Sequence, residues 1–263
     1  MSVSTTPSPY PTLPPELLEK IVCQIKKERT LLACSQVSRA FEHYSFRQLF
    51  CCLHICCEEG TVGTFHRLMP RSHRIFQYVE ELGIRCRVFP HESNHQQLCQ
   101  VLKLFVEHSD GCLEKIVLQR ISWGQLTSGL RTALMALLAY PSVKTLEFEY
   151  VNEFPLTAFR HVSPGLKTFR TTSTECSPDL LDDAPEDTSI TIPAARPEQL
   201  IISSKGNLES RLIDRVPNPL DVSHLALLTM VVRFKPDWEL MQRLMQNASN
   251  TLECVSVAFQ SGT

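Results

Sequence analysis

Glycine is scarce in this 263-residue sequence, which contains nine glycines against 17 prolines. So few glycines disfavour glycine-rich loops that cradle phosphate groups, whereas the prolines favour many short elements that each end at a proline. No apolar run approaches the roughly 18 residues needed to span a bilayer, so we expect no membrane segment. The formal net charge is −2, and without a basic excess we expect no nucleic-acid partner.

The N-terminus lacks the features of a secretory signal. Residues 1–10 are rich in Ser, Thr and Pro, and they contain no basic region followed by an apolar stretch. We expect a disordered lead-in over residues 1–11 and a cytoplasmic and/or nuclear protein. The 11 cysteines are an odd number. In a chain with no secretory signal, reduced and buried thiols are a simpler interpretation than disulfides.

Residues 13–50 have the pattern of three short helices. Pro15 suits a first helical turn, where a missing N–H costs nothing, and apolar residues then recur at helical spacing. The three apolar faces consist of Leu17, Leu18, Ile21 and Ile25; of Leu31, Leu32, Cys34 and Val37; and of Phe41, Tyr44, Leu49 and Phe50. A segment of about 40 residues buries little surface alone. We therefore expect it to pack on the following domain or on another protein.

The same segment resembles an F-box. The matching positions are Leu13, Pro14, Glu16, Leu17, Ile21, Leu32, Cys34, Val37, Ser38, Arg39 and Phe41. Gln36 stands where members often carry an apolar residue, and Phe41 where many carry Trp. The resemblance implies that this face docks on the Skp-type adaptor of an SCF ubiquitin ligase, as apolar anchors in a groove. The implied adaptor-binding residues are Leu13, Pro14, Leu17, Ile21, Leu32, Val37 and Phe41.

A short apolar pattern recurs through the rest of the chain. Apolar residues stand at the first, fourth and sixth positions of Val79–Ile84, Leu113–Leu118 and Val143–Phe148, with related instances further on. The central residues are Leu82, Ile116, Leu146, Phe169, Leu200, Leu228 and Val255, at separations of 23 to 34 residues. This is the strand signature of leucine-rich repeats. The intervening segments 96–108, 129–140 and 236–247 have apolar residues at helical spacing.

A doubly wound α/β domain would also alternate strands with helices. Two observations disfavour it: no Gly-x-Gly or Gly-Lys-Ser turn follows any strand, and the strands are short. We therefore predict an α/β fold class with a small all-α F-box-like module over 12–57. An irregular leucine-rich-repeat-like α/β solenoid follows over 58–263, with an acidic surface loop at 171–198.

This combination resembles F-box proteins with degenerate leucine-rich repeats, a type abundant in mushroom-forming fungi. The sequence stops at Ser261-Gly262-Thr263, soon after a predicted strand, and a bare last repeat would leave an exposed edge. We therefore expect the sequence to be a truncated product or a fragment.

Candidate chemistry is sparse. In Cys51-Cys52-Leu53-His54-Ile55-Cys56-Cys57, a metal would need further ligands such as Cys86, and small apolar residues of a joining strand are the favoured interpretation. No family signature flanks a Cys–His pair that could act as a nucleophile and base. We expect no cofactor, no metal and no enzymatic activity. A local basic concentration consists of His66, Arg67, Arg71, His73, Arg74, Arg85 and Arg87, and a solvated surface is favoured over a site for an acidic partner.

The predicted function is that of a substrate-recognition adaptor in an SCF-type E3 ubiquitin ligase. The box would bind the Skp-type adaptor and through it the cullin, and the repeats would bind a protein substrate on their strand face. The alternative is a non-catalytic repeat scaffold for protein–protein interaction whose N-terminal helices only cap the solenoid. The identity of the substrate and the oligomeric state stay open.

Overall fold

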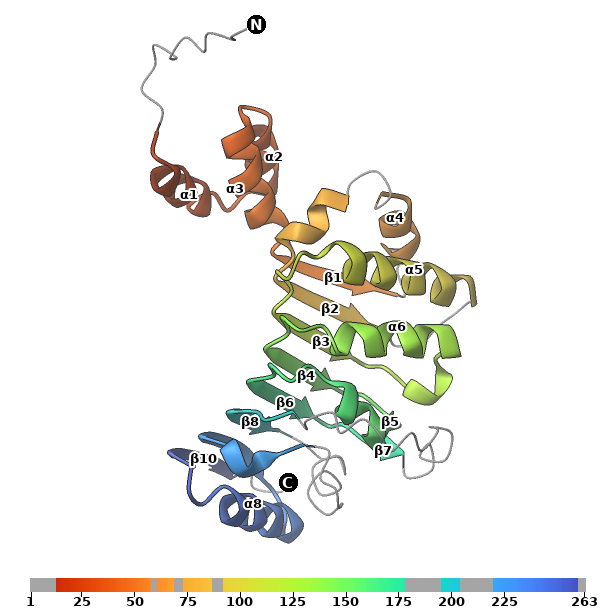
Figure 1. Ribbon diagram of the computed structural model, residues 1–263, viewed down its shortest axis with the longest axis vertical. Coiled ribbons are helices and arrows are strands. Elements are labelled where there is room, and N and C mark those ends of the chain that lie inside the picture. Colours follow the sequence, from red (N-terminus) through yellow and green to blue (C-terminus); the bar gives the residue numbers. More distant parts are fainter. Residues whose placement is uncertain are drawn as a thin grey trace, which may run out of the picture. The chain divides into compact units, whose positions relative to one another are not determined.

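The computed structural model describes residues 13–57, 61–68, 73–86, 92–177, 195–203 and 220–259 (Figure 1). The predicted lead-in and most of the predicted acidic loop lie outside these ranges. The chain divides into two compact units, Met1–Cys51 and Cys52–Thr263. Among the helices that the structure describes, none is both long and apolar enough to cross a membrane.

The first unit contains three helices: α1 (Pro15–Cys23), α2 (Glu28–Ser35) and α3 (Arg39–Phe50). Pro15 opens α1 because a helix needs no N–H at its first position. The Ser38 hydroxyl caps α3 by accepting a hydrogen bond from the Phe41 N–H. Both α1 and α2 pack against α3, and Arg47 on α3 pairs with Glu19 on α1 at 3.2 Å.

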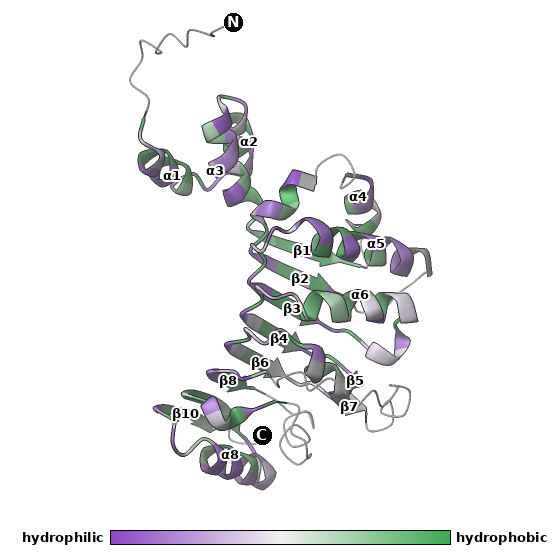
Figure 2. Ribbon diagram, viewed as in Figure 1, coloured by the Kyte–Doolittle hydropathy of each residue, from purple (hydrophilic) through white to green (hydrophobic). Residues whose placement is uncertain are grey.

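The second unit is built on one open sheet of eight parallel strands, which follow each other across the sheet in chain order. The strands contain both hydrophobic and hydrophilic residues (Figure 2). They are β1 (Cys52–Cys56), β2 (Glu81–Arg85), β3 (Lys115–Gln119), β4 (Thr145–Glu149), β6 (Thr168–Thr172), β8 (Gln199–Ile202), β9 (Leu227–Val232) and β10 (Cys254–Phe259). A separate pair is formed by β5 (Phe154–Pro155) and β7 (Cys176–Ser177).

Helices connect the successive strands of the sheet, except β6 and β8, between which most of the chain lies outside the described residues. The α-helices are α4 (Thr61–Leu68), α5 (Glu92–His108), α6 (Ser128–Leu138) and α8 (Lys235–Asn247). Short 3-10 helices are η2 (His73–Tyr78), η3 (Trp123–Gln125), η4 (Leu156–His161) and η5 (Val222–His224). Neighbouring helices α4, α5 and α6 pack side by side, as Figure 1 shows. The Thr127 hydroxyl caps α6 by accepting the Leu130 N–H.

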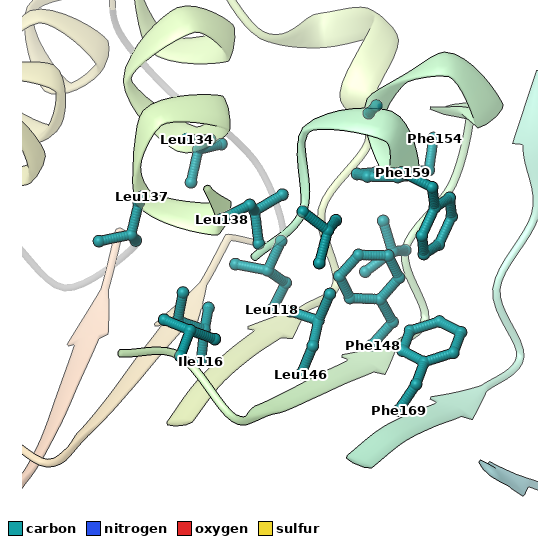
Figure 3. Close-up of a cluster of buried hydrophobic side chains, with 14 of the residues drawn as sticks. Ile116, Leu118, Leu134, Leu137, Leu138, Leu146, Phe148, Phe154, Phe159 and Phe169 are labelled. Carbon is teal, nitrogen blue, oxygen red and sulfur yellow. The ribbon is translucent and has the colours of Figure 1, made fainter. Parts of the chain in front are cut away.

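The core lies between the helices and one face of the sheet. The residues that the recurring pattern singled out are aligned across the strands, so that Leu82 pairs with Ile116, which pairs with Leu146. Figure 3 shows leucines of α6 facing these strands. The Phe148 ring lies 4.8, 6.0 and 5.5 Å from the rings of Phe154, Phe159 and Phe169, respectively. All of these side chains are buried.

The predicted fold class, a small all-α F-box-like helical module followed by an irregular leucine-rich-repeat-like α/β solenoid, is wrong in this division, although its α/β class agrees with the described residues. The described residues instead have an α/β fold organised around a single eight-stranded parallel sheet. Residues 52–56, which fell inside the predicted all-α module, form strand β1 and pair in register with β2. The apolar spacing indicated where strands lie, but it carries no information on the hydrogen bonds that join them into one sheet.

Candidate protein-interaction surfaces

Helix α1 exposes apolar side chains on a stripe next to its buried one, about 100° around the helix axis. Leu18 and Val22 are buried, whereas Leu17 and Ile21 are 46% and 47% exposed. Each pair is spaced by four residues, so each forms a stripe along the helix. The sequence had placed Leu17, Leu18 and Ile21 on one face, and packing of α1 against α3 divides that face into an inner and an outer stripe.

The exposed stripe belongs to a larger set of apolar residues in the first unit. We call Leu13, Leu17, Ile21, Leu32 and Val37 the outward apolar set; all five are exposed. Pro14 is also exposed, and Phe41 is half-buried. The set therefore contains five of the seven residues implied as adaptor-binding. Exposed apolar side chains that lie together, as Leu17 and Ile21 do along α1, are typical of surfaces that bind another protein.

The second unit exposes the other face of its sheet. In β4 and β6 the side chains that alternate with the buried ones include Glu147 and Arg170, because successive residues of a strand point to opposite faces. We call this side the open face. Across β2 to β6 the charged residues at these alternating positions are Glu81, Arg85, Lys115, Glu147, Glu149 and Arg170. Ion pairs join four of them: Glu81, Lys115, Glu147 and Arg170.

These four side chains form a charge ladder across neighbouring strands. The Lys115 Nζ lies 3.3 Å from carboxylate oxygens of both Glu81 and Glu147, and the Arg170 guanidinium lies 3.6 Å from Glu147. Burial of the Lys115 ammonium would lower its pKa, but the charges and hydrogen bonds of Glu147 and Glu81 outweigh that effect and raise the pKa above its ordinary value. The ladder is thus internally neutralised.

A second polar group lies where strands β3 and β4 end. Gln119 donates a hydrogen bond of 2.7 Å to Glu149. In the next position along each strand, the Arg120 guanidinium stands over the Tyr150 ring, 5.9 Å from its centroid. Tyr150 is 52% exposed. Together they present a guanidinium and a phenol ring to solvent, and these groups are enriched among residues that dominate binding energy.

The backbone at this pair, and at Ser173 beside it, has the uncommon left-handed conformation. Arg120, Tyr150 and Ser173 have φ angles of 55°, 57° and 49°, in the left-handed region. The Arg120 N–H donates to the Glu149 carbonyl, and the Tyr150 N–H to the Thr172 carbonyl. The sequence did not lead us to predict a role for Arg120, Tyr150 or Ser173. Their signal was present, because each residue follows the central apolar residue of its pattern by four positions.

The cysteine-rich segment places its side chains on alternating sides of β1. Cys52 and His54 are exposed and Ile55 is buried. Cys57 and Cys86, both buried, are joined in a disulfide with their Cα atoms 5.1 Å apart. The expectation of reduced thiols is therefore wrong for this pair. Within the described ranges, no group of three or more His, Cys, Asp or Glu residues is arranged to hold a metal ion.

The predicted basic concentration is only partly described. Arg67 donates a hydrogen bond to the Gly63 carbonyl within α4, and Arg85 is exposed at the end of β2. Arg71 and Arg87 lie outside the described residues, as does most of the acidic loop. The expectation of a solvated surface over the basic residues thus stays a prediction.

No family model matches the sequence, and no curated protein matches it either. The F-box resemblance therefore depends on the sequence positions quoted for it. What the structure adds is the placement of the outward apolar set and of the open face, and these are the two surfaces from which a function is proposed.

Proposed function

We propose that this protein is a substrate-recognition adaptor of an SCF-type E3 ubiquitin ligase. The first unit docks on the Skp-type adaptor and brings the chain to the cullin, and the second unit binds a protein substrate. The observation that supports the proposal is the exposure of the outward apolar set at positions that the F-box resemblance implies as contacts.

Burial of this set in a groove contributes to the free energy of docking. Burying a leucine-sized side chain completely is worth about 1.5–3 kcal/mol. Leu17 and Ile21 retain about half of their surface in water, so each gains about 1 kcal/mol when covered. They lie on one stripe of α1, and such a stripe fits the groove that receives an amphipathic helix.

The substrate-binding role is assigned to the open face and to the Arg120–Tyr150 pair just beyond the ends of β3 and β4. The charge ladder is satisfied by its own ion pairs, so a partner gains little by replacing them. The Arg120–Tyr150 pair offers an exposed ring and a guanidinium that are already oriented. Catalysis then belongs to other subunits of the ligase, and this chain contributes proximity and orientation of the substrate.

The test is binding of purified Skp-type adaptor to the full chain. Leu17→Ala combined with Val37→Ala removes two exposed apolar side chains from the first unit, and we expect the adaptor to be lost from pull-downs. Tyr150→Ala is the matched control, because it removes an exposed side chain from the second unit and leaves docking unchanged. Equal recovery of the adaptor by the double variant and the unmodified chain would contradict the proposal.

A further inference from the structure

A disulfide joins strands β1 and β2 just beyond the point where both strands end. The two strands are parallel and in register up to the pair Cys56↔Arg85. Cys57 and Cys86 are the next residues of the two strands, and the Cys57 N–H donates to the Arg85 carbonyl at 2.9 Å. The Cα atoms of Cys57 and Cys86 lie 5.1 Å apart, within the range that a disulfide spans. The two sulfurs meet because the register of the strands continues through this position.

This disulfide lies on the core side of the sheet. Side chains alternate between the two faces of a strand, so Cys57 shares the face of Ile55, and Cys86 shares the face of Ile84. All four residues are buried. The thiol of Cys56, one residue earlier, belongs to the open face and is free. The fold therefore pairs Cys86 with Cys57 and not with the neighbouring cysteine.

Strand β1 has few other attachments to the second unit. Of its five residues only Ile55 is buried, whereas three residues of β2 and three of β3 are buried. Cys52 and His54 are exposed. The Thr61 hydroxyl at the start of α4 donates to the Cys56 carbonyl. A strand that buries so few residues opens more readily than its neighbours, so the disulfide supplies a large part of the attachment of β1.

We infer that Cys57 and Cys86 form a redox-sensitive clasp, in which the disulfide holds β1 on the sheet and its reduction lets β1 open. This inference goes beyond the proposed function and does not rest on it. Strand β1 begins at Cys52, directly after the last residue of the first unit, Cys51. Opening of β1 therefore adds its five residues to the chain that connects the two units, and the clasp sets the length of that connection.

The reaction partner is a low-molecular-weight thiol and its disulfide, such as reduced and oxidised glutathione. During oxidation one cysteine thiolate attacks oxidised glutathione and releases a glutathione thiolate. The second cysteine thiolate attacks the resulting mixed disulfide and releases another. The two protein thiols thus lose two electrons and two protons, and one oxidised glutathione becomes two reduced molecules. Because both protein sulfurs are buried, glutathione reaches them while β1 is open, and the rate of exchange follows that opening.

The first test equilibrates the full chain in glutathione buffers with different ratios of the reduced to the oxidised form. Acid quenching, alkylation of free thiols and peptide mass spectrometry then give the state of each cysteine, and circular dichroism reports whether the chain is folded. We expect Cys57 and Cys86 to convert together while the chain stays folded, and Cys112, a free thiol, to form no disulfide within the chain. A disulfide that resists reduction until the chain unfolds, or one that never forms, would overturn the inference.

The second test measures hydrogen exchange in the oxidised and the reduced chain. Peptides that cover β1 should exchange about 30-fold faster after reduction, which is the lower end of the effect of a typical disulfide. Peptides that cover β4 should not change. Cys86→Ser should have the fast rate in both buffers, and Cys56→Ser is the matched control that removes the neighbouring thiol and keeps the response. Equal exchange of β1 in the oxidised and reduced unmodified chain would contradict the clasp.

Discussion

Two adjacent leucines of α1 have opposite environments, and their substitution should separate binding from stability. Leu18 is 8% exposed and Leu17 is 46% exposed. Replacing a buried leucine by alanine lowers the free energy of unfolding by about 2–5 kcal/mol. We take the lower bound of about 2 kcal/mol because the first unit is small. Replacing an exposed leucine changes stability by less than about 0.5 kcal/mol. Leu17→Ala instead forfeits about 1 kcal/mol of docking energy, or about 5-fold in Kd.

Hydrogen exchange followed by mass spectrometry measures both variants in the full chain, since peptides from α1, α2 and α3 report the opening of the first unit. If Leu18→Ala lowers the free energy of opening by about 2 kcal/mol, these peptides exchange about 30-fold faster. In Leu17→Ala their exchange rate changes by less than about 3-fold. Peptides from β3 and β4 serve as the internal control and should be unaffected. If Leu17→Ala accelerates exchange as strongly as Leu18→Ala, the outer stripe is a packing face and the argument fails.

Two further predictions concern the second unit. Phe148→Ala should lower the free energy of unfolding by about 3–5 kcal/mol in urea titrations, because it empties a buried site lined by three aromatic rings; Tyr150→Ala should lower it by less than about 1 kcal/mol. The raised pKa of Lys115 contributes stability below its ordinary pKa of about 10.5, and this contribution is lost as the pH rises through the folded-state pKa. The stability lost at alkaline pH should therefore be smaller in Glu147→Gln than in the unmodified chain. Equal losses of stability in the two proteins would refute the ion-pair account.

Much of the second unit could be predicted from the recurring pattern. Residues such as Leu82, Ile116 and Leu146 lie at the centres of strands, because three apolar positions within six residues favour a short buried strand. A joining strand was expected at β1, yet the predicted helical module ran to residue 57 and enclosed it, although Phe50, Leu53 and Ile55 fit the strand pattern. Phe50 also continues the helical spacing of α3. Because it fits both the helical spacing and the strand pattern, it does not show where the helix ends.

The two stripes of α1 could not be separated from sequence. Leu17, Leu18 and Ile21 lie within one broad apolar sector, because successive residues are about 100° apart on a helix. Such a sector is wider than the surface that a single neighbouring helix covers. Which part is buried depends on the approach of α3, and local spacing holds no information on that approach.

A search for sequence motifs could not find the charged residues of the open face. Glu81, Lys115 and Glu147 come together only because three parallel strands are in register, and about 30 residues separate neighbours in the sequence. Charges brought together in this way neutralise one another, so the ladder gives the face little net attraction for a charged partner. Under the proposed function, selectivity depends on groups that the ladder leaves unneutralised, and the Arg120–Tyr150 pair at the strand ends meets that condition. Arg120→Ala should accordingly weaken substrate capture more than any single substitution within the ladder.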